Sequence, residues 1–247
     1  MTFEINSAGL YLMIALLWAA MRVIRGLTTR QFDFKRELAV TLFFVFLCLL
    51  SYRLFEPFRF NLEKTLKANF VPIVNSLLMI QRAEATRYQP LIRIVQLLLV
   101  GNVVVFIPVG FFPAVLFRDL RSGWKVLLLG AGFSLVIEVL QVLLAVRVFD
   151  VDDILLNALG TWLGFGFFRL LYALPPLREL FDAIASAQRK DALAFFVFTG
   201  LSFGLVFWGF VYSGWQAAQN AGEYILREQE GRTLLQWLRW LFSRGYD

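Results

Sequence analysis

Carboxylates and an amide gather just before an apolar run in the second half of the chain. The stretch FDVDDILLNALG carries Asp150, Asp152 and Asp153, and Asn157 follows four residues after the last of them. Residues four apart share one face of a helix, so Asp153 and Asn157 would form a polar stripe. Such groups can bind cations or hydroxyl groups, transfer protons, or hold a divalent cation.

Three more polar residues interrupt apolar runs. Asn102 lies in LLVGNVVVFIPVGFF, and Glu138 and Gln141 lie in SLVIEVLQVLL. The apolar run around Glu138 extends about 15 Å to either side, which predicts a position near the membrane midplane. A carboxylate at that depth must be protonated, paired or in a wet cavity. Arg147 is nine residues on and about 180° around the helix, so we expect a partner for Glu138 on another helix.

Two interpretations of these groups compete. In the structural one, the aspartates cap the following helix, where aspartate is favoured, and the amides hydrogen-bond helices together. Capping explains one or two carboxylates, but it explains neither three of them nor a glutamate at the midplane. In the functional interpretation the groups line a pocket whose rim sets Glu138 and the three aspartates against Arg147, a net charge of −3. Such a rim favours a cationic or polyhydroxylated ligand over a bare phosphate.

The composition places these residues in a membrane protein. Hydrophobic residues make up 59% of the 247 residues and charged residues only 17%. No histidine is present, and Cys48 is the single cysteine, which excludes a histidine base, a His-rich metal site and an internal disulfide. We identify no metal site and expect no cofactor. The net charge of +6 reports membrane orientation, and no nucleic-acid partner is expected.

The elements that position these groups are apolar helices. Six stretches approach the roughly 20 residues that a helix needs to span a bilayer, which predicts an all-α, polytopic helical bundle forming one membrane domain over residues 1–247. Gly160 and Gly164 form a small-xxx-small pair that lets another helix approach closely. The predicted spans are residues 8–24, 38–55, 95–117, 126–148, 154–173 and 192–213.

The distribution of Lys and Arg predicts the orientation. Twelve of them lie in the short segments 22–36, 118–125 and 169–191, and the other twelve, including those of the long loop 56–94, are spread over nearly twice the length. Because short, positively charged segments stay in the cytoplasm, both termini and the aspartates are expected to face outward.

Two further stretches have the pattern of amphipathic surface helices. Residues 175–190 place apolar side chains at i, i+3, i+4 and i+7, which predicts a helix lying on the inner face. The tail, residues 214–247, contains LLQWLRWLFSR, where leucines share a stripe and tryptophans suit the interface. We expect both to anchor the chain to the membrane surface.

Four motifs in order resemble those of the VanZ-like family of bacterial membrane proteins, named for a factor linked to teicoplanin resistance. They are NFVPIVN, GNVVVFIPVGFF, IEVLQ and R-x-x-D-x-x-D-x-x-x-N-x-x-G, which define a VanZ-like core over about residues 69–172. Ile73 departs from the family, where an aromatic residue is usual. The resemblance implies a protein of the bacterial cytoplasmic membrane with a role in antibiotic tolerance, but no settled reaction. The family patterns fall on Asn102, Phe106, Pro108, Gly110, Glu138, Gln141, Arg147, Asp150, Asp153, Asn157 and Gly160.

Three functions fit these observations. The first, which we expect, is a non-enzymatic protein that contacts membrane lipids and binds a lipid headgroup, a lipid-linked cell-wall precursor or a lipoglycopeptide in the outer leaflet. The second is an enzyme acting on a lipid-linked substrate, with Glu138 or Asp153 as general acid or base and a divalent cation on the aspartates. The third is a lipid or small-molecule transporter that uses a buried glutamate. The absence of a repeat and of a polar stripe through the inner half stands against the third.

Overall fold

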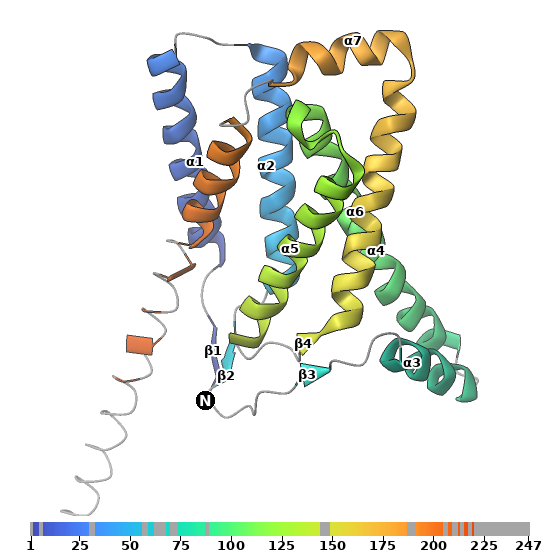
Figure 1. The fold of residues 1–247 in the computed structure, drawn as a ribbon. Helices are drawn as coiled ribbons and strands as arrows, with labels where there is room; N and C mark the ends of the chain where they lie inside the picture. The colour runs from blue at the N-terminus through green and yellow to red at the C-terminus, as the bar shows by residue number, and fades with distance from the viewer. Residues whose placement is uncertain are drawn as a thin grey trace, which may run out of the picture.

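The structure is a computed structural model, and its regular elements are almost entirely helices (Figure 1). It describes residues 2–4, 7–29, 33–55, 59–61, 68–69, 74–86, 89–143, 149–186, 191–204, 207–208, 212, 215–216 and 219. The elements are β1 (Thr2–Glu4), α1 (Ser7–Thr29), α2 (Phe34–Phe55), β2 (Arg59–Asn61), β3 (Ala68–Asn69), α3 (Val74–Ala85), α4 (Gln89–Leu116), η1 (Arg118–Leu120), α5 (Gly123–Leu143), β4 (Phe149–Asp150), α6 (Val151–Tyr172) and α7 (Pro175–Ile184), followed by a helix over Asp191–Gly204. The predicted all-α membrane bundle is confirmed.

Four described helices are long and apolar enough to cross a membrane, namely α1, α4, α5 and α6. Their outer faces expose large apolar side chains, such as Leu97 on α4, Leu128 on α5 and Leu170 on α6. These surfaces suit lipid contact, because lipid takes the place of water around them. The other two predicted spans are also helical, as α2 and Asp191–Gly204. The chain is therefore a multi-pass membrane protein.

The segment 56–94 is not the long loop that the sequence predicts. It contains α3, and α4 begins at Gln89, six residues before the predicted start. Two short strand pairs also lie at this end of the bundle (Figure 1). Strands β1 and β2 pair antiparallel, and β3 pairs parallel with β4 so that Asn69 is opposite Asp150. The β3–β4 pair therefore brings the segment before α3 to the start of α6.

Glycines hold the central pair of helices, α4 and α6, in backbone contact. A Cβ atom added at Gly160 would lie 2.0 Å from the carbonyl oxygen of Val103, and one at Gly164 would lie 1.9 Å from that of Ile107. Real Cβ atoms do not approach backbone oxygen so closely, so these positions require glycine. The predicted close helix contact is confirmed, and its partner is α4.

Aromatic side chains join α1, α2 and the helix Asp191–Gly204 on one side of the bundle. The rings of Trp18 and Phe44 stack at 4.2 Å between centroids, and Phe195 meets Trp18 edge-on at 5.5 Å. All three side chains are buried. Each such pair adds about 0.5–1.5 kcal/mol beyond the burial of apolar area, so these contacts hold the three helices together.

The helix α7 lies across the opposite end of the bundle from β4 (Figure 1). Its apolar side chains Phe181 and Ile184 are buried, whereas Arg178 and Glu179 are exposed. The predicted amphipathic helix is thus present, although it ends at Ile184 and residues 187–190 lie outside the described part. The predicted amphipathic stretch of the tail also lies outside the described residues.

A cluster of polar contacts fixes α7 to the bundle. Arg121, next to η1, donates to a carboxylate oxygen of Asp182 and, at 3.0 Å, to the carbonyl of Phe181. The hydroxyl of Tyr172 donates to Asp182 at 3.1 Å, and the Arg121 guanidinium lies 4.8 Å from the centre of the Tyr172 ring. The hydrogen bond from Arg121 is the main cause that lowers the pKa of Asp182 below its ordinary value of 3.8.

The lowered pKa of Asp182 predicts an acid-dependent loss of stability. A carboxyl whose pKa is lower in the folded state stabilises the fold above its unfolded pKa, and this stability is lost as the pH falls through the folded value. We expect Asp182→Asn to lower the Tm at pH 7 by up to about 4 °C, with the difference from the wild type shrinking and then vanishing as the pH falls below the ordinary carboxyl value of 3.8 and through the lowered pKa of Asp182. Thermal unfolding in detergent between pH 2 and 7 measures this. Asp119→Asn, in η1, is the control, and equal pH profiles for Asp182→Asn and the wild type would contradict the expectation.

Candidate functional site

Asp150 caps the N-terminus of α6. Its backbone is extended, with φ −131° and ψ 117°, and its Oδ1 accepts a hydrogen bond from the Asp152 N–H at 3.0 Å. This is the geometry of an N-cap, so the structural interpretation holds for Asp150. Asp152 is 4% exposed, whereas Asp150 and Asp153 are half-buried. The three aspartates therefore lie in different surroundings, and Asp152 does not form part of an open rim.

Glu138 lies directly beside the start of α6, closer to the aspartates than the sequence predicts. Its Oε2 accepts a hydrogen bond from the backbone N–H of Asp150 at 3.0 Å, and the side chain is 2% exposed. The partner lies outside α5, as predicted, but it is the backbone before α6. Glu138 thus belongs to the same end of the bundle as the aspartates.

A side-chain hydrogen bond joins Asn102 on α4 to Asp153 on α6. The Nδ2 of Asn102 donates to the Oδ1 of Asp153 at 2.5 Å. Both side chains are half-buried, so this contact lies at the edge of the helix pair. Hydrogen bonds to a charged carboxylate are stronger than those between neutral groups. The structure brings these two predicted residues together one to two turns from the glycine contact at Gly160.

Asn157 faces α5 and not α4, so the predicted polar stripe of α6 is divided between two neighbours. Its Nδ2 donates to the Oγ of Ser134 at 2.8 Å, and its Oδ1 has no hydrogen-bond partner among the described residues. Ser134 and Glu138 are four residues apart on α5, and Gly130, four residues earlier, packs against Thr161. One stripe of α5 therefore meets α6 along its first three turns.

Two other predicted site residues, Gln141 and Pro108, do not join this cluster, and a third is not among the described residues. Gln141 is buried, and its Nε2 donates to the carbonyl of Leu54 on α2 at 3.4 Å. Pro108 is half-buried in α4, about 9 Å along the helix axis from Asn102. Arg147 lies outside the described residues.

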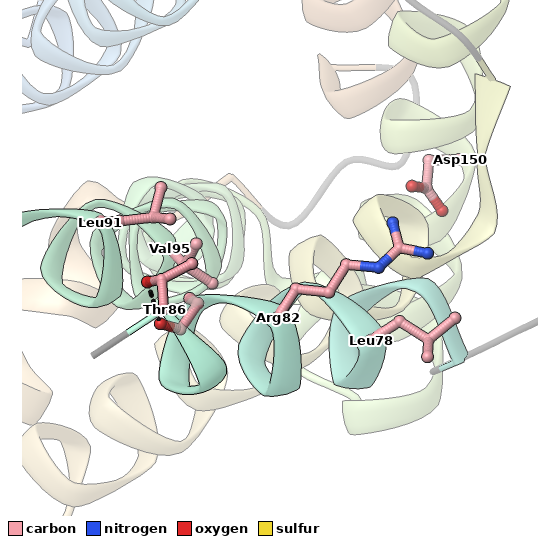
Figure 2. A pocket seen from close by; sticks show the side chains of 7 residues that line it. Leu78, Arg82, Thr86, Leu91, Val95 and Asp150 are labelled. Carbon is pink, nitrogen blue, oxygen red and sulfur yellow. Dashed lines mark hydrogen bonds between the residues drawn. The ribbon is translucent and has the colours of Figure 1, made fainter. Parts of the chain in front are cut away.

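A pocket that the sequence did not predict opens beside Asp150 (Figure 2). Its volume is about 430 Å³, within the range of pockets that bind small molecules and cofactors. Figure 2 shows the side chains of Arg82, on α3, and Asp150 pointing toward each other across it. Arg82 is exposed and forms no ion pair with another described residue. The lining residues are Leu78, Arg82, Ala83, Thr86, Leu91, Val95 and Asp150.

Sequence reasoning missed Ser134 and Arg82, for different reasons. Ser134 lies four residues before Glu138, and this helical spacing could have placed it on the same face. Arg82 lies in the segment 56–94, which the sequence predicts to be a loop with several Lys and Arg residues, so nothing distinguished it as long as the helix α3 was not recognised. The spacing Leu78, Arg82, Thr86 is the signal that could have found it, because residues four apart share a helix face.

The carboxylates around the start of α6 do not form an evident metal centre in the described part of the chain. Among the described residues, no group of three or more Asp, Glu, Cys or His side chains is placed to hold a metal ion. Asp150 caps α6, Glu138 accepts from a backbone N–H, and Asp153 accepts from an amide. These hydrogen bonds give the carboxylates defined positions around the start of α6.

Comparison with known families gave a match that covers this region. The model of the family described as VanZ/LLP1 matches residues 40–172, which run from α2 to the end of α6 and include every residue of the polar cluster. Neither the curated proteins nor the solved structures gave a match.

Proposed function

The chain belongs to the VanZ/LLP1 family, and on that premise we propose that it binds an amphiphilic ligand at the end of the bundle where α6 begins. The ligand is a lipid headgroup, a lipid-linked cell-wall precursor or a lipoglycopeptide, held at the outer leaflet of the bacterial cytoplasmic membrane. Binding there contributes to antibiotic tolerance. The proposal adopts the orientation that the Lys and Arg distribution predicts.

One observation carries the proposal: Asp150 belongs both to the polar cluster and to the wall of an apolar pocket. Its backbone N–H donates to Glu138, and its side chain lines the pocket beside Leu91 and Val95. Ligand sites typically combine apolar walls with a few fixed polar groups. An amphiphile would place its polar part against the carboxylates and its apolar part along α4.

The position of Glu138 favours binding over the enzymatic and transport alternatives. The transport alternative uses a buried glutamate that exchanges a proton, and the enzymatic alternative uses Glu138 or Asp153 as the acid or base. Glu138 and Asp153 instead accept hydrogen bonds, from the Asp150 backbone and from the Asn102 amide. A carboxylate that is held in place by such a hydrogen bond is suited to positioning the groups of a binding site.

The proposal is tested by removing the charge of Asp153. Asp153→Asn keeps an oxygen that accepts from Asn102, so the fold should be retained. A teicoplanin-type lipoglycopeptide with a free amine and a lipid-linked precursor are titrated against the protein in phosphatidylcholine nanodiscs. We expect at least one of them to bind the wild type and to bind Asp153→Asn about tenfold more weakly, the loss of one charge-assisted hydrogen bond.

Asp119→Asn is the matched control, because Asp119 lies in η1 at the opposite end of the bundle. It should bind like the wild type. If neither probe binds the wild type, or if Asp153→Asn binds as tightly as the wild type, the proposal is wrong.

A further inference from the structure

We propose that the pocket between α3 and α4 selects a phospholipid whose headgroup carries both a phosphate and a primary ammonium group. The phosphate binds Arg82, and the ammonium is directed toward the carboxylate of Asp150. This inference rests on the proposed function, since it assigns the class of amphiphile that this end of the bundle takes. It differs from the expectation of a ligand without phosphate, which was drawn from a rim that did not include Arg82.

The two charged groups face one pocket from different elements. Arg82 comes from α3, and Asp150 comes from β4 at the start of α6, and in Figure 2 their side chains point toward each other. The Arg82 guanidinium makes no ion pair with another described residue, so its donors remain available to a ligand. A guanidinium binds phosphate oxygens in pairs, and a carboxylate can accept several hydrogen bonds at once, of which the one from the Asp152 N–H to Asp150 is an example.

The depth of the pocket matches the boundary between headgroups and acyl chains. Asp150 immediately precedes the span formed by α6, which starts at Val151, so it lies at the edge of the apolar layer. Leu91 and Val95 follow the start of the span Gln89–Leu116 by about 3 and 9 Å along its axis. The charged groups therefore lie at the edge, and the apolar wall continues into the membrane.

The chemistry of the remaining wall is consistent with an acyl chain. Val95 and Ala83 are buried, while Leu91 remains partly exposed where a chain would enter. The hydroxyl of Thr86 donates to the carbonyl of Ala83 at 2.6 Å, so it is already used within α3. A pocket of about 430 Å³ accommodates a headgroup with the first part of a chain, not a whole diacyl lipid.

Lipid retention tests this inference. The protein is reconstituted in vesicles with equal parts of phosphatidylethanolamine, phosphatidylcholine and phosphatidylglycerol, extracted in mild detergent, and analysed for bound lipid by native mass spectrometry. We expect phosphatidylethanolamine to be retained about tenfold over the other two, because only it carries both the phosphate and a hydrogen-bonding ammonium. Arg82→Gln should lose this preference. Arg93→Gln, an exposed arginine of α4 outside the pocket lining, should keep it.

The inference would be overturned by equal retention of the three lipids by the wild type, or by an unchanged preference in Arg82→Gln. Equal loss of the preference in Arg82→Gln and Arg93→Gln would also overturn it, because a general basic surface would then account for the retention. These outcomes leave the proposed function separately testable. That function fails on the Asp153→Asn titration, in which phosphatidylcholine is the only bilayer lipid and the probes are the lipoglycopeptide and the lipid-linked precursor.

Discussion

Replacing Gly160 by leucine is expected to abolish the folded protein. The Cβ atom alone would lie 2.0 Å from the carbonyl oxygen of Val103, and Gly110 opposes Thr161 with the same closeness from the other helix. The obstacle is backbone, which cannot rotate away as a side chain would. Separating α4 from α6 costs more than about 3 kcal/mol, against a total stability of about 5–15 kcal/mol. Fluorescence-detected size-exclusion chromatography of detergent extracts measures the folded yield.

Gly166 is the matched control for this change, because it lies on the same helix and a Cβ atom added there would meet nothing within 4 Å. Gly166→Leu should give normal yield, and Gly160→Ala should already reduce the yield because its Cβ meets the same oxygen. Normal yield and unchanged thermal stability for Gly160→Leu would contradict the close α4–α6 contact. A loss equal to that of Gly166→Leu would show that the effect is not specific to the contact.

The sequence predicted this contact because small residues at i and i+4 of an apolar helix typically mark the close approach of a second helix. Gly160 and Gly164 were therefore enough to predict a close neighbour, although not which helix it is. The polar end of the bundle was also predictable, because Asp150, Asp153 and Asn157 are close in sequence and lie where an apolar span begins. In such cases the local pattern alone determines the arrangement.

The position of Glu138 was not predictable in the same way. The apolar residues continue to Val148, so composition gives no signal that Glu138 lies beside the start of α6. A tertiary contact, the hydrogen bond from the Asp150 N–H, places it there. Gln141 does not point toward the same neighbour as Glu138, for a geometric reason. Three residues of helix turn by about 300°, which is 60° short of a full turn, so the Gln141 side chain points about 60° away from Glu138 and reaches α2.

The helix α3 and its pocket were also beyond the sequence pattern. The stretch from Val74 to Ala85 has only 12 residues, with polar and apolar residues mixed. Its position depends on α4 and on the β3–β4 pair, which joins residues about 80 apart in the chain. Arg82 becomes a site residue only when that long-range placement is known.

Removing the charge of Glu138 is expected to separate folding from function. In Glu138→Gln the side-chain amide keeps an oxygen that accepts from the Asp150 N–H, so the cap of α6 should persist and the Tm should stay close to that of the wild type. A cationic group about 6 Å away loses about 1–3 kcal/mol of attraction, which corresponds to roughly ten- to hundredfold weaker binding. The lipoglycopeptide titration and the antibiotic tolerance of cells carrying the variant measure this loss.

Glu138→Leu completes the comparison, because it removes both the charge and the acceptor. The N–H of Asp150 would then lose its hydrogen bond to Glu138 in a partly buried place, which costs about 1 kcal/mol. We therefore expect Glu138→Leu to lose thermal stability as well as binding, whereas Glu138→Gln loses binding alone. Asp153→Asn should behave like Glu138→Gln, since it also removes one charge and keeps an acceptor. A folded Glu138→Gln protein with wild-type binding and full tolerance would show that Glu138 only connects α5 to the start of α6.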